Sequence, residues 1–277
     1  MILLSLVCAV AFAQDDLAEF TTAEKGAEGA EKPETDLSAE FGGALVSGNA
    51  IYYSLNGSLV FSHKWLKNKL RADARSTYSA GKADGDGDGT LNDAERSIAN
   101  QELARKFSSD VRYDRYLTER DALYVWVGGM HDPFAGYDVR VHEQLGYARD
   151  VVSNDKTKLS TEVGFDWAHE FFTEPQAEGN NFLEDSDTYE NVLAGRVGVG
   201  FSHAFNESVS FTDTVDTYVN VMDPADTRVL NSAALNTKLS GTFSLKLSHQ
   251  LTFDNVPVEG FQKLDQTSMV TFVASIF

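Results

Sequence analysis

The residues best suited to a chemical role form a short acidic stretch at 84–95, Asp-Gly-Asp-Gly-Asp-Gly-Thr-Leu-Asn-Asp-Ala-Glu. Calcium prefers about six to eight oxygen ligands, and an EF-hand loop supplies them from alternate positions, ending in a bidentate glutamate. Gly89 falls where such a loop turns sharply, a conformation that glycine adopts at low cost. The expected calcium ligands are Asp84, Asp86, Asp88, the backbone carbonyl of Thr90, Asn92 and Glu95.

A solvated acidic loop is the alternative interpretation, because Asp-Gly repeats also arise as low-complexity sequence. Leu91 and Glu95 favour the calcium loop, since such a repeat explains neither. The preceding residues 70–78 alternate like a half-exposed strand and show no entering helix, whereas 92–106 are expected to begin a short helix capped by Asn92. A lone loop of this kind predicts weak Ca²⁺ binding, with a dissociation constant of about 10⁻⁴ to 10⁻³ M.

The first part of the chain is expected to direct export. Residues 1–13 are apolar and end in a small-x-small cleavage pattern, which indicates a signal peptide. Cys8 lies within this segment, so the mature chain is expected to lack disulfides and thiol chemistry. Residues 14–34 are rich in alanine and glutamate and are expected to form an acidic periplasmic tail or linker. The net charge of −19 argues against a nucleic-acid partner.

Residues 35–277 form a succession of strand-length segments in which apolar and polar residues alternate, most clearly at 243–254. Such segments predict an all-β, antiparallel, up-and-down transmembrane β-barrel, because only a closed sheet satisfies every backbone group in a bilayer without helices. The expected strands number twelve, with the calcium loop inserted between the third and fourth. They are 36–47, 51–62, 69–80, 102–116, 121–132, 138–150, 157–171, 189–203, 208–222, 231–240, 243–254 and 266–277.

The connections between these strands support a barrel. Every second connection is short, as periplasmic turns are, and the long ones at 81–101, 172–188, 223–230 and 255–265 all fall at the opposite end. A soluble β-sandwich also alternates, but it requires no such parity. The terminal Phe277 is typical of chains that the bacterial barrel-insertion machinery recognises, so we expect that machinery as a partner during biogenesis and outer-membrane lipids thereafter.

Several motifs resemble a bacterial family filed as domain of unknown function 481 and labelled salt-induced outer membrane protein. The resemblance spans 35–277 and implies an outer-membrane barrel without established activity. The chain departs from the family pattern at the calcium loop and at 142–144. The motifs are Leu-Thr-Glu-Arg at 117–120, Asp-Pro-Phe-Ala-Gly-Tyr-Asp-Val-Arg at 132–140, Leu-Gly-Tyr at 145–147, Leu-Lys-Leu-Ser at 245–248, Asp254-Asn255, Pro257, Gly260-Phe261 and Lys263.

The histidines do not indicate an enzyme, because they occupy different strands and turns and none has metal-ligand spacing. His142 is expected to face the lumen as an ordinary polar residue, although a catalytic set assembled from separate strands remains an alternative. The expected lumen face carries both signs of charge, so it either holds water or is closed by ion pairs. These residues are Arg71, Arg75, Arg112, Arg140 and Arg196 with Asp73, Asp110, Asp114, Glu162, Asp166 and Asp216.

The sequence therefore predicts a non-enzymatic barrel of the bacterial outer membrane that serves the envelope or responds to ionic stress, with an extracellular loop that binds calcium. Two alternatives stay open. One is an outer-membrane barrel hydrolase acting on lipids. The other is a channel for small solutes.

Overall fold

The computed structural model describes residues 33–46, 51–82, 92–173, 189–257 and 263–276. The expected signal segment and nearly all of the expected tail lie outside these residues, as do the expected calcium ligands Asp84, Asp86, Asp88 and Thr90. Within the described part of the chain, no helix is long and apolar enough to cross a membrane.

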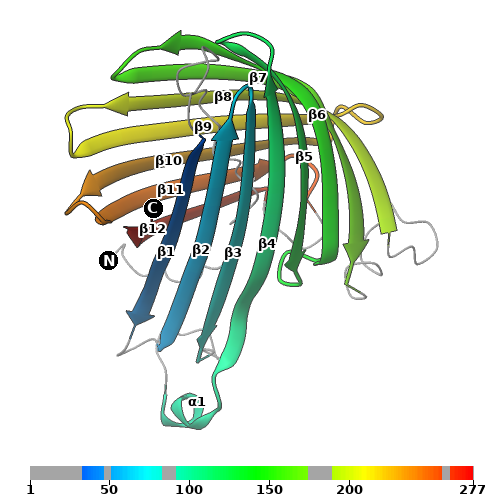
Figure 1. Cartoon of the computed structure of the whole chain (residues 1–277). Helices are drawn as coiled ribbons and strands as arrows, with labels where there is room; N and C mark the ends of the chain where they lie inside the picture. Colours follow the sequence, from blue (N-terminus) through cyan, green and yellow to red (C-terminus); the bar gives the residue numbers. More distant parts are fainter. Residues whose placement is uncertain (1–32, 47–50, 83–91, 174–188, 258–262, 277) are drawn as a thin grey trace.

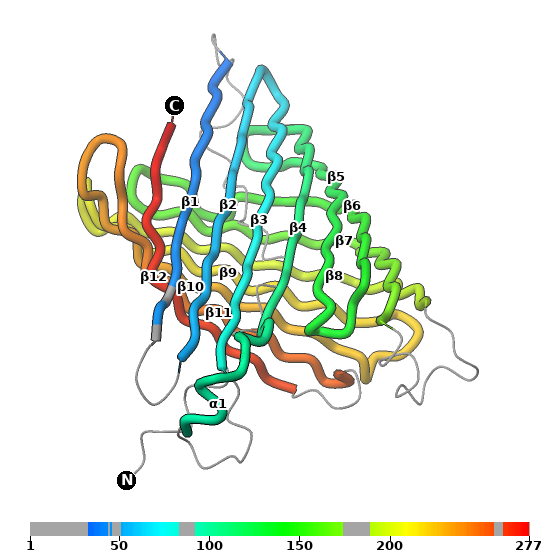
Figure 2. Tube along the Cα trace, turned by 90° about the horizontal axis from the view of Figure 1, so that it is seen from below, coloured from blue at the N-terminus to red at the C-terminus, as the bar shows by residue number. Residues whose placement is uncertain are grey.

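Twelve antiparallel strands follow one another around a closed barrel (Figure 1). Among the described residues there is a single short helix, α1 (Asp93–Ser97), which lies beyond the ends of the third and fourth strands in both overall views (Figures 1 and 2). The strands are β1 (Glu34–Val46), β2 (Tyr52–Trp65), β3 (Asn68–Gly81), β4 (Gln101–Tyr116), β5 (Asp121–Asp132), β6 (Tyr137–Ser153), β7 (Thr157–Phe172), β8 (Tyr189–Ala204), β9 (Val209–Asn220), β10 (Thr227–Lys238), β11 (Phe243–Asp254) and β12 (Leu264–Ser275).

The barrel closes between its first and last strands. Ser38 to Gly42 of β1 pair with Ser275 to Thr271 of β12, a shorter register than that of any other neighbouring pair. The two ends of the barrel differ in their connections. One end, which we call the turn side, carries the connections 66–67, 117–120, 154–156, 205–208 and 239–242 together with the ends of β1 and β12. The opposite end, the loop side, carries the longer connections.

The barrel is apolar outside and polar inside, the reverse of a water-soluble protein. Outward side chains at the middle of the strands are aliphatic or aromatic, and Leu145 and Phe165 are both 62% exposed. Inward side chains are frequently charged, and Arg196 is only 1% exposed. An apolar exterior around a closed sheet is what a bilayer requires, because no backbone group is left unpaired towards lipid.

The predicted strand map is confirmed, with the largest difference at β10. This strand begins at Thr227 rather than at 231, because its first residues pair with the end of β9 despite the neighbouring Asp-Pro turn signal. The helix expected over 92–106 is much shorter. Asn92 caps α1 as expected, but Ile98 takes an extended conformation and the chain pairs with β3 from Gln101 onwards.

Candidate functional site

The centre of the lumen holds a buried network of ion pairs. Arg112 of β4 donates to both carboxylate oxygens of Glu162 on β7, over 2.8 and 3.1 Å, and to Asp114 over 2.7 Å. Arg196 of β8 donates to the same Glu162 over 2.7 Å and pairs with Asp216 of β9 at 2.6 Å. The side chains of this network are at most 4% exposed. The network joins strands β4, β7, β8 and β9 and closes the space beside them.

Tyr124 of β5 packs against this network, and glycines on the neighbouring strands leave room for its side chain. Its hydroxyl accepts a hydrogen bond of 2.8 Å from Arg196, and the guanidinium of Arg112 lies 4.2 Å from the ring centre. A Cβ atom at Gly146 on β6 would collide with the tyrosine ring, and one at Gly164 on β7 would meet its hydroxyl. These two glycines therefore provide the room in which an aromatic ring and two arginines pack inside the barrel.

His142 of β6 lies in the next layer of the lumen, between two carboxylates. Its Nε2 atom is 3.2 Å from Asp110 and its Nδ1 atom is 3.3 Å from Asp166. Trp126 donates its indole N–H to the same oxygen of Asp110 over 2.9 Å, and its ring meets the imidazole edge-on at 5.1 Å. The expectation that His142 faces the lumen is confirmed, and its contacts hold three strands together.

A third group of charges crosses the lumen near the loop side. Arg228 of β10 donates to Glu170 of β7 over 2.9 Å, and its Nε atom lies 3.2 Å from Asp254 of β11. Arg140 of β6 pairs with the same Glu170 at 3.2 Å. Because β7 and β10 are three strands apart, the contact of Arg228 with Glu170 reaches over part of the lumen, whereas Asp254 lies on the neighbouring strand.

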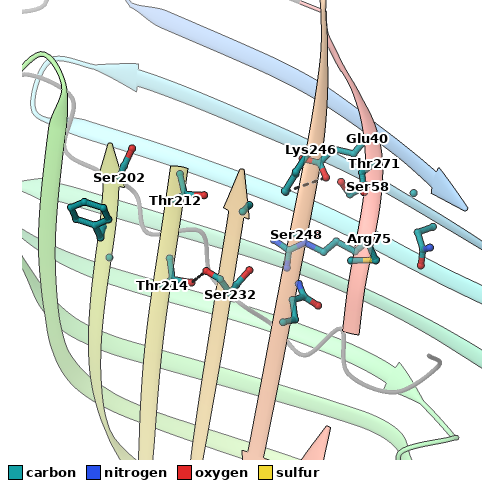
Figure 3. A pocket seen from close by; sticks show the side chains of 17 residues that line it. Glu40, Ser58, Arg75, Ser202, Thr212, Thr214, Ser232, Lys246, Ser248 and Thr271 are labelled. Carbon is teal, nitrogen blue, oxygen red and sulfur yellow. Dashed lines mark hydrogen bonds and ion pairs between the residues drawn. The ribbon is translucent and has the colours of Figure 1, made fainter. Parts of the chain in front are cut away.

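The other side of the lumen is open. A cavity of about 290 Å³ lies against β1, β2, β3 and β8 to β12, and Figure 3 shows side chains from opposite walls pointing into it. Its wall contains three charged residues, Glu40, Arg75 and Lys246, and is otherwise mainly uncharged. The hydroxyl groups come from Ser58, Ser202, Thr212, Thr214, Ser232, Ser248 and Thr271. We call this space the hydroxyl cavity.

A second cavity, of about 250 Å³, opens at the loop side. Of the residues that the structure describes, five carboxylates and one cation, Arg228, line it, so this part of the entrance is acidic. A small void of about 30 Å³ lies between this entrance and the centre, lined partly by Arg140, Arg228 and Leu230. Arg228 lines both the entrance and this void. The five carboxylates are Glu170, Glu190, Asp223, Asp226 and Asp254.

Of the expected calcium ligands, the structure describes two. The Asn92 side chain accepts from the backbone N–H groups of Ala94 and Glu95, over 3.0 and 3.1 Å. The Glu95 carboxylate accepts from the backbone N–H of Asn92 over 2.9 Å, which completes a capping box. Both residues thus lie at the start of α1, where their side-chain oxygens accept backbone N–H groups. Among the described residues, no group of three or more histidine, cysteine or acidic side chains is arranged to hold a metal ion.

The lumen charges expected from alternation are confirmed, but four important residues were not foreseen. Glu170 follows the parity of Asp166 and would have been found by extending that face along the strand. Arg228 was missed because its strand was expected to begin three residues later. The inward direction of Tyr124 and Trp126 could not be predicted from the sequence. Residues 122–127 are apolar on both faces, so the pattern does not show which face points into the lumen.

The sheet is closed, its exterior is apolar, and its lumen holds ion pairs and a polar cavity. These features define a transmembrane β-barrel. The chain belongs to the family described as "Protein of unknown function, DUF481", whose model matches residues 39–276. The resemblance to that family is therefore confirmed.

Solved structures with a similar fold include several bacterial barrels. The NanC porin is 10% identical with a TM-score of 0.46, and 87% of this chain and 98% of that one are covered. An outer-membrane channel from Pseudomonas putida F1 is 11% identical with a TM-score of 0.48, covering 88% and 95%. The P. putida toluene transporter TodX is 9% identical with a TM-score of 0.38, covering 97% and 94%. These likenesses are too distant to carry functional argument, and no curated protein matches the chain.

Proposed function

We propose that this protein is a non-enzymatic barrel of the bacterial outer membrane that passes small polar solutes through the hydroxyl cavity. The division of the lumen carries this proposal. Ion pairs close the side formed by β4 to β9, whereas the opposite side retains about 290 Å³ with a mostly uncharged polar wall. A protein that needed only a stable barrel gains nothing from leaving one half of its interior open, because a void forfeits packing contacts.

The outer membrane is the location that suits this architecture. Bacterial outer-membrane barrels have an even number of antiparallel strands, short periplasmic turns and longer extracellular loops. The turn-side connections of this chain have four residues or fewer, and both ends of the barrel sequence are on that side. On this basis the turn side faces the periplasm and the acidic entrance faces outwards. The surrounding partners are then outer-membrane lipids, after delivery by the barrel-insertion machinery.

The conductance of the purified protein in a planar bilayer tests the proposal. We expect small, discrete steps, because the contact of Arg228 with Glu170 reaches over part of the lumen. Ser248→Trp is expected to abolish most of the current, since Ser248 is 4% exposed and lines the hydroxyl cavity. The matched control is Ser268→Trp, which places the same side chain on the outward face of the neighbouring strand. A folded, heat-modifiable wild-type barrel without conductance would disprove the channel.

The hydrolase alternative centres on His142. A catalytic histidine must have one ring nitrogen directed at a nucleophile. Here both nitrogens of His142 face carboxylates, Asp110 and Asp166, an arrangement that favours a structural role. The purified barrel is therefore expected to release no fatty acid from a panel of phospholipids. Hydrolysis that disappears in His142→Ala, with heat-modifiable folding retained, would establish the enzyme instead.

Calcium binding by the loop at 84–95 is a second proposed property, with a role in the response of the envelope to ionic conditions. It is supported by the position of Asn92 and Glu95, which lie together at the first turn of α1 in a capping box. Their ligand atoms are hard oxygens, as calcium requires. Calorimetry on the refolded barrel is expected to give a dissociation constant of about 10⁻⁴ to 10⁻³ M. An isotherm that is unchanged in Glu95→Gln would exclude the site, and the neighbouring Asp93→Asn is the matched control.

A further inference from the structure

We infer that the hydroxyl cavity selects uncharged, hydroxyl-bearing solutes of the size of a small sugar or polyol, an inference that rests on the proposed channel function. Its volume of about 290 Å³ is at the lower end of the range for small-molecule sites. The wall combines a high density of hydroxyl groups with charges that neutralise one another.

The hydroxyl groups of the cavity suit a polyol because each can both donate and accept a hydrogen bond. Thr212 and Thr214 on β9 and Ser232 on β10 face the cavity from one wall, and Ser58 on β2 faces it from another (Figure 3). A solute that carries several hydroxyls can therefore exchange its water partners for wall partners as it moves. Such exchange keeps the cost of dehydration low at every position.

Gln250 lines the cavity from β11 and adds a side-chain amide to the polar wall.

Each charged residue in the wall has an ion-pair partner, which weakens its attraction for an ionic solute. Lys246 on β11 lies 3.1 Å from Glu40 on β1, and this pair spans the seam at which the barrel closes. Arg75 lies 3.1 Å from Asp73 on its own strand, and Arg71 approaches the same carboxylate to 3.4 Å. An ion entering the cavity would lose hydration and find only partners that already have an opposite charge beside them, which is costly in a confined space. The acidic loop-side entrance disfavours anions before they reach this point.

Solute entry into proteoliposomes tests the inference. The uncharged probes are erythritol, arabinose and glucose, and the charged probes of similar size are sodium gluconate and glucosamine hydrochloride. We expect the charged probes to enter about tenfold more slowly than glucose, because each must be dehydrated in the cavity. Ion selectivity is measured in parallel from the reversal potential across a planar bilayer under a potassium chloride gradient, where the wild-type barrel is expected to discriminate weakly.

Two single variants remove one member of the neutralised pair. Lys246→Met leaves Glu40 alone and is expected to shift the reversal potential towards cation selectivity and to speed glucosamine entry. Glu40→Gln removes the carboxylate charge beside Lys246 and is expected to shift the reversal potential in the opposite direction. Both variants are expected to fold, because this pair is about one-fifth exposed and such pairs contribute about 0–1 kcal/mol. Lys238→Met removes an exposed lysine that does not line the cavity and is the control.

The outcomes separate the inference from the proposed function. Entry of gluconate and glucosamine as fast as glucose, or equal reversal potentials in both variants, would overturn the selectivity while leaving a channel in place. A folded barrel that passes neither ions nor erythritol would refute the channel itself. Preferential entry of the uncharged probes, with opposite shifts in the two variants, would support both.

Discussion

Replacing Arg196 by methionine tests whether the ion-pair network in the lumen is dry. Arg196 is 0% exposed at its side chain, and its partners Glu162 and Asp216 are 1% and 0% exposed. Removing one partner of a buried pair costs about 3–5 kcal/mol, because an uncompensated charge remains in a low-dielectric environment. Arg112 still compensates Glu162, so the excess charge in Arg196→Met falls mainly on Asp216. We therefore expect a loss of about 3–5 kcal/mol in the free energy of unfolding.

The measurement is equilibrium unfolding of the refolded barrel in lipid vesicles by guanidinium chloride, followed by tryptophan fluorescence and by gel mobility. Adding Asp216→Asn to Arg196→Met is expected to recover more than half of the lost stability, because the uncompensated charge is then absent. Lys246→Met provides the comparison for a partly exposed pair, where the expected loss is about 0–1 kcal/mol.

A loss of less than about 1 kcal/mol in Arg196→Met would refute this reasoning. That result would show that water reaches the network and screens it. The side of the lumen formed by β4 to β9 would then be part of a wider aqueous passage, and the division of the lumen would be wrong.

Three further predictions follow from the packing. Gly146→Val is expected to destabilise the barrel by about 1–3 kcal/mol in the same unfolding assay, because its Cβ atom would collide with the Tyr124 ring. The control is Gly195→Val, which is expected to be tolerated because its side chain meets open space on the outer face. Phe165→Arg places a charge in the lipid-facing middle of β7 and is expected to lower the free energy of unfolding by about 2–4 kcal/mol. The control is Glu119→Arg in a turn-side connection. Equal stabilities of the two variants would argue against a bilayer around this surface. Arg228→Met removes the group that reaches Glu170 across the lumen and is expected to raise the single-channel conductance without abolishing folding; an unchanged conductance would place the constriction elsewhere.

The strands and their inward faces followed from the sequence because both are local properties. Alternation along 157–171 and 243–254 assigns each side chain to one face of its strand. In a membrane barrel the apolar face must contact lipid and the polar face must line the lumen, so the same assignment holds for every strand. The expected lumen charges, including Arg112, Glu162 and Asp216, consequently point inwards. The start of β10 was the weakest boundary, because pairing with β9 overrides a turn signal that is local.

The pairing of those charges was decided only by the tertiary structure. Arg112 on β4 meets Glu162 on β7, and Arg228 on β10 meets Glu170 on β7, so each pair joins strands that are not neighbours in the sheet. Such contacts depend on the curvature of the barrel and on the glycines that make room for Tyr124. The alternation of polar and apolar residues predicts neither of these features. The sequence alone therefore determined that this is a barrel with a charged interior. The tertiary structure decided that half of the interior is closed by ion pairs and that the other half retains a cavity lined largely by hydroxyl groups.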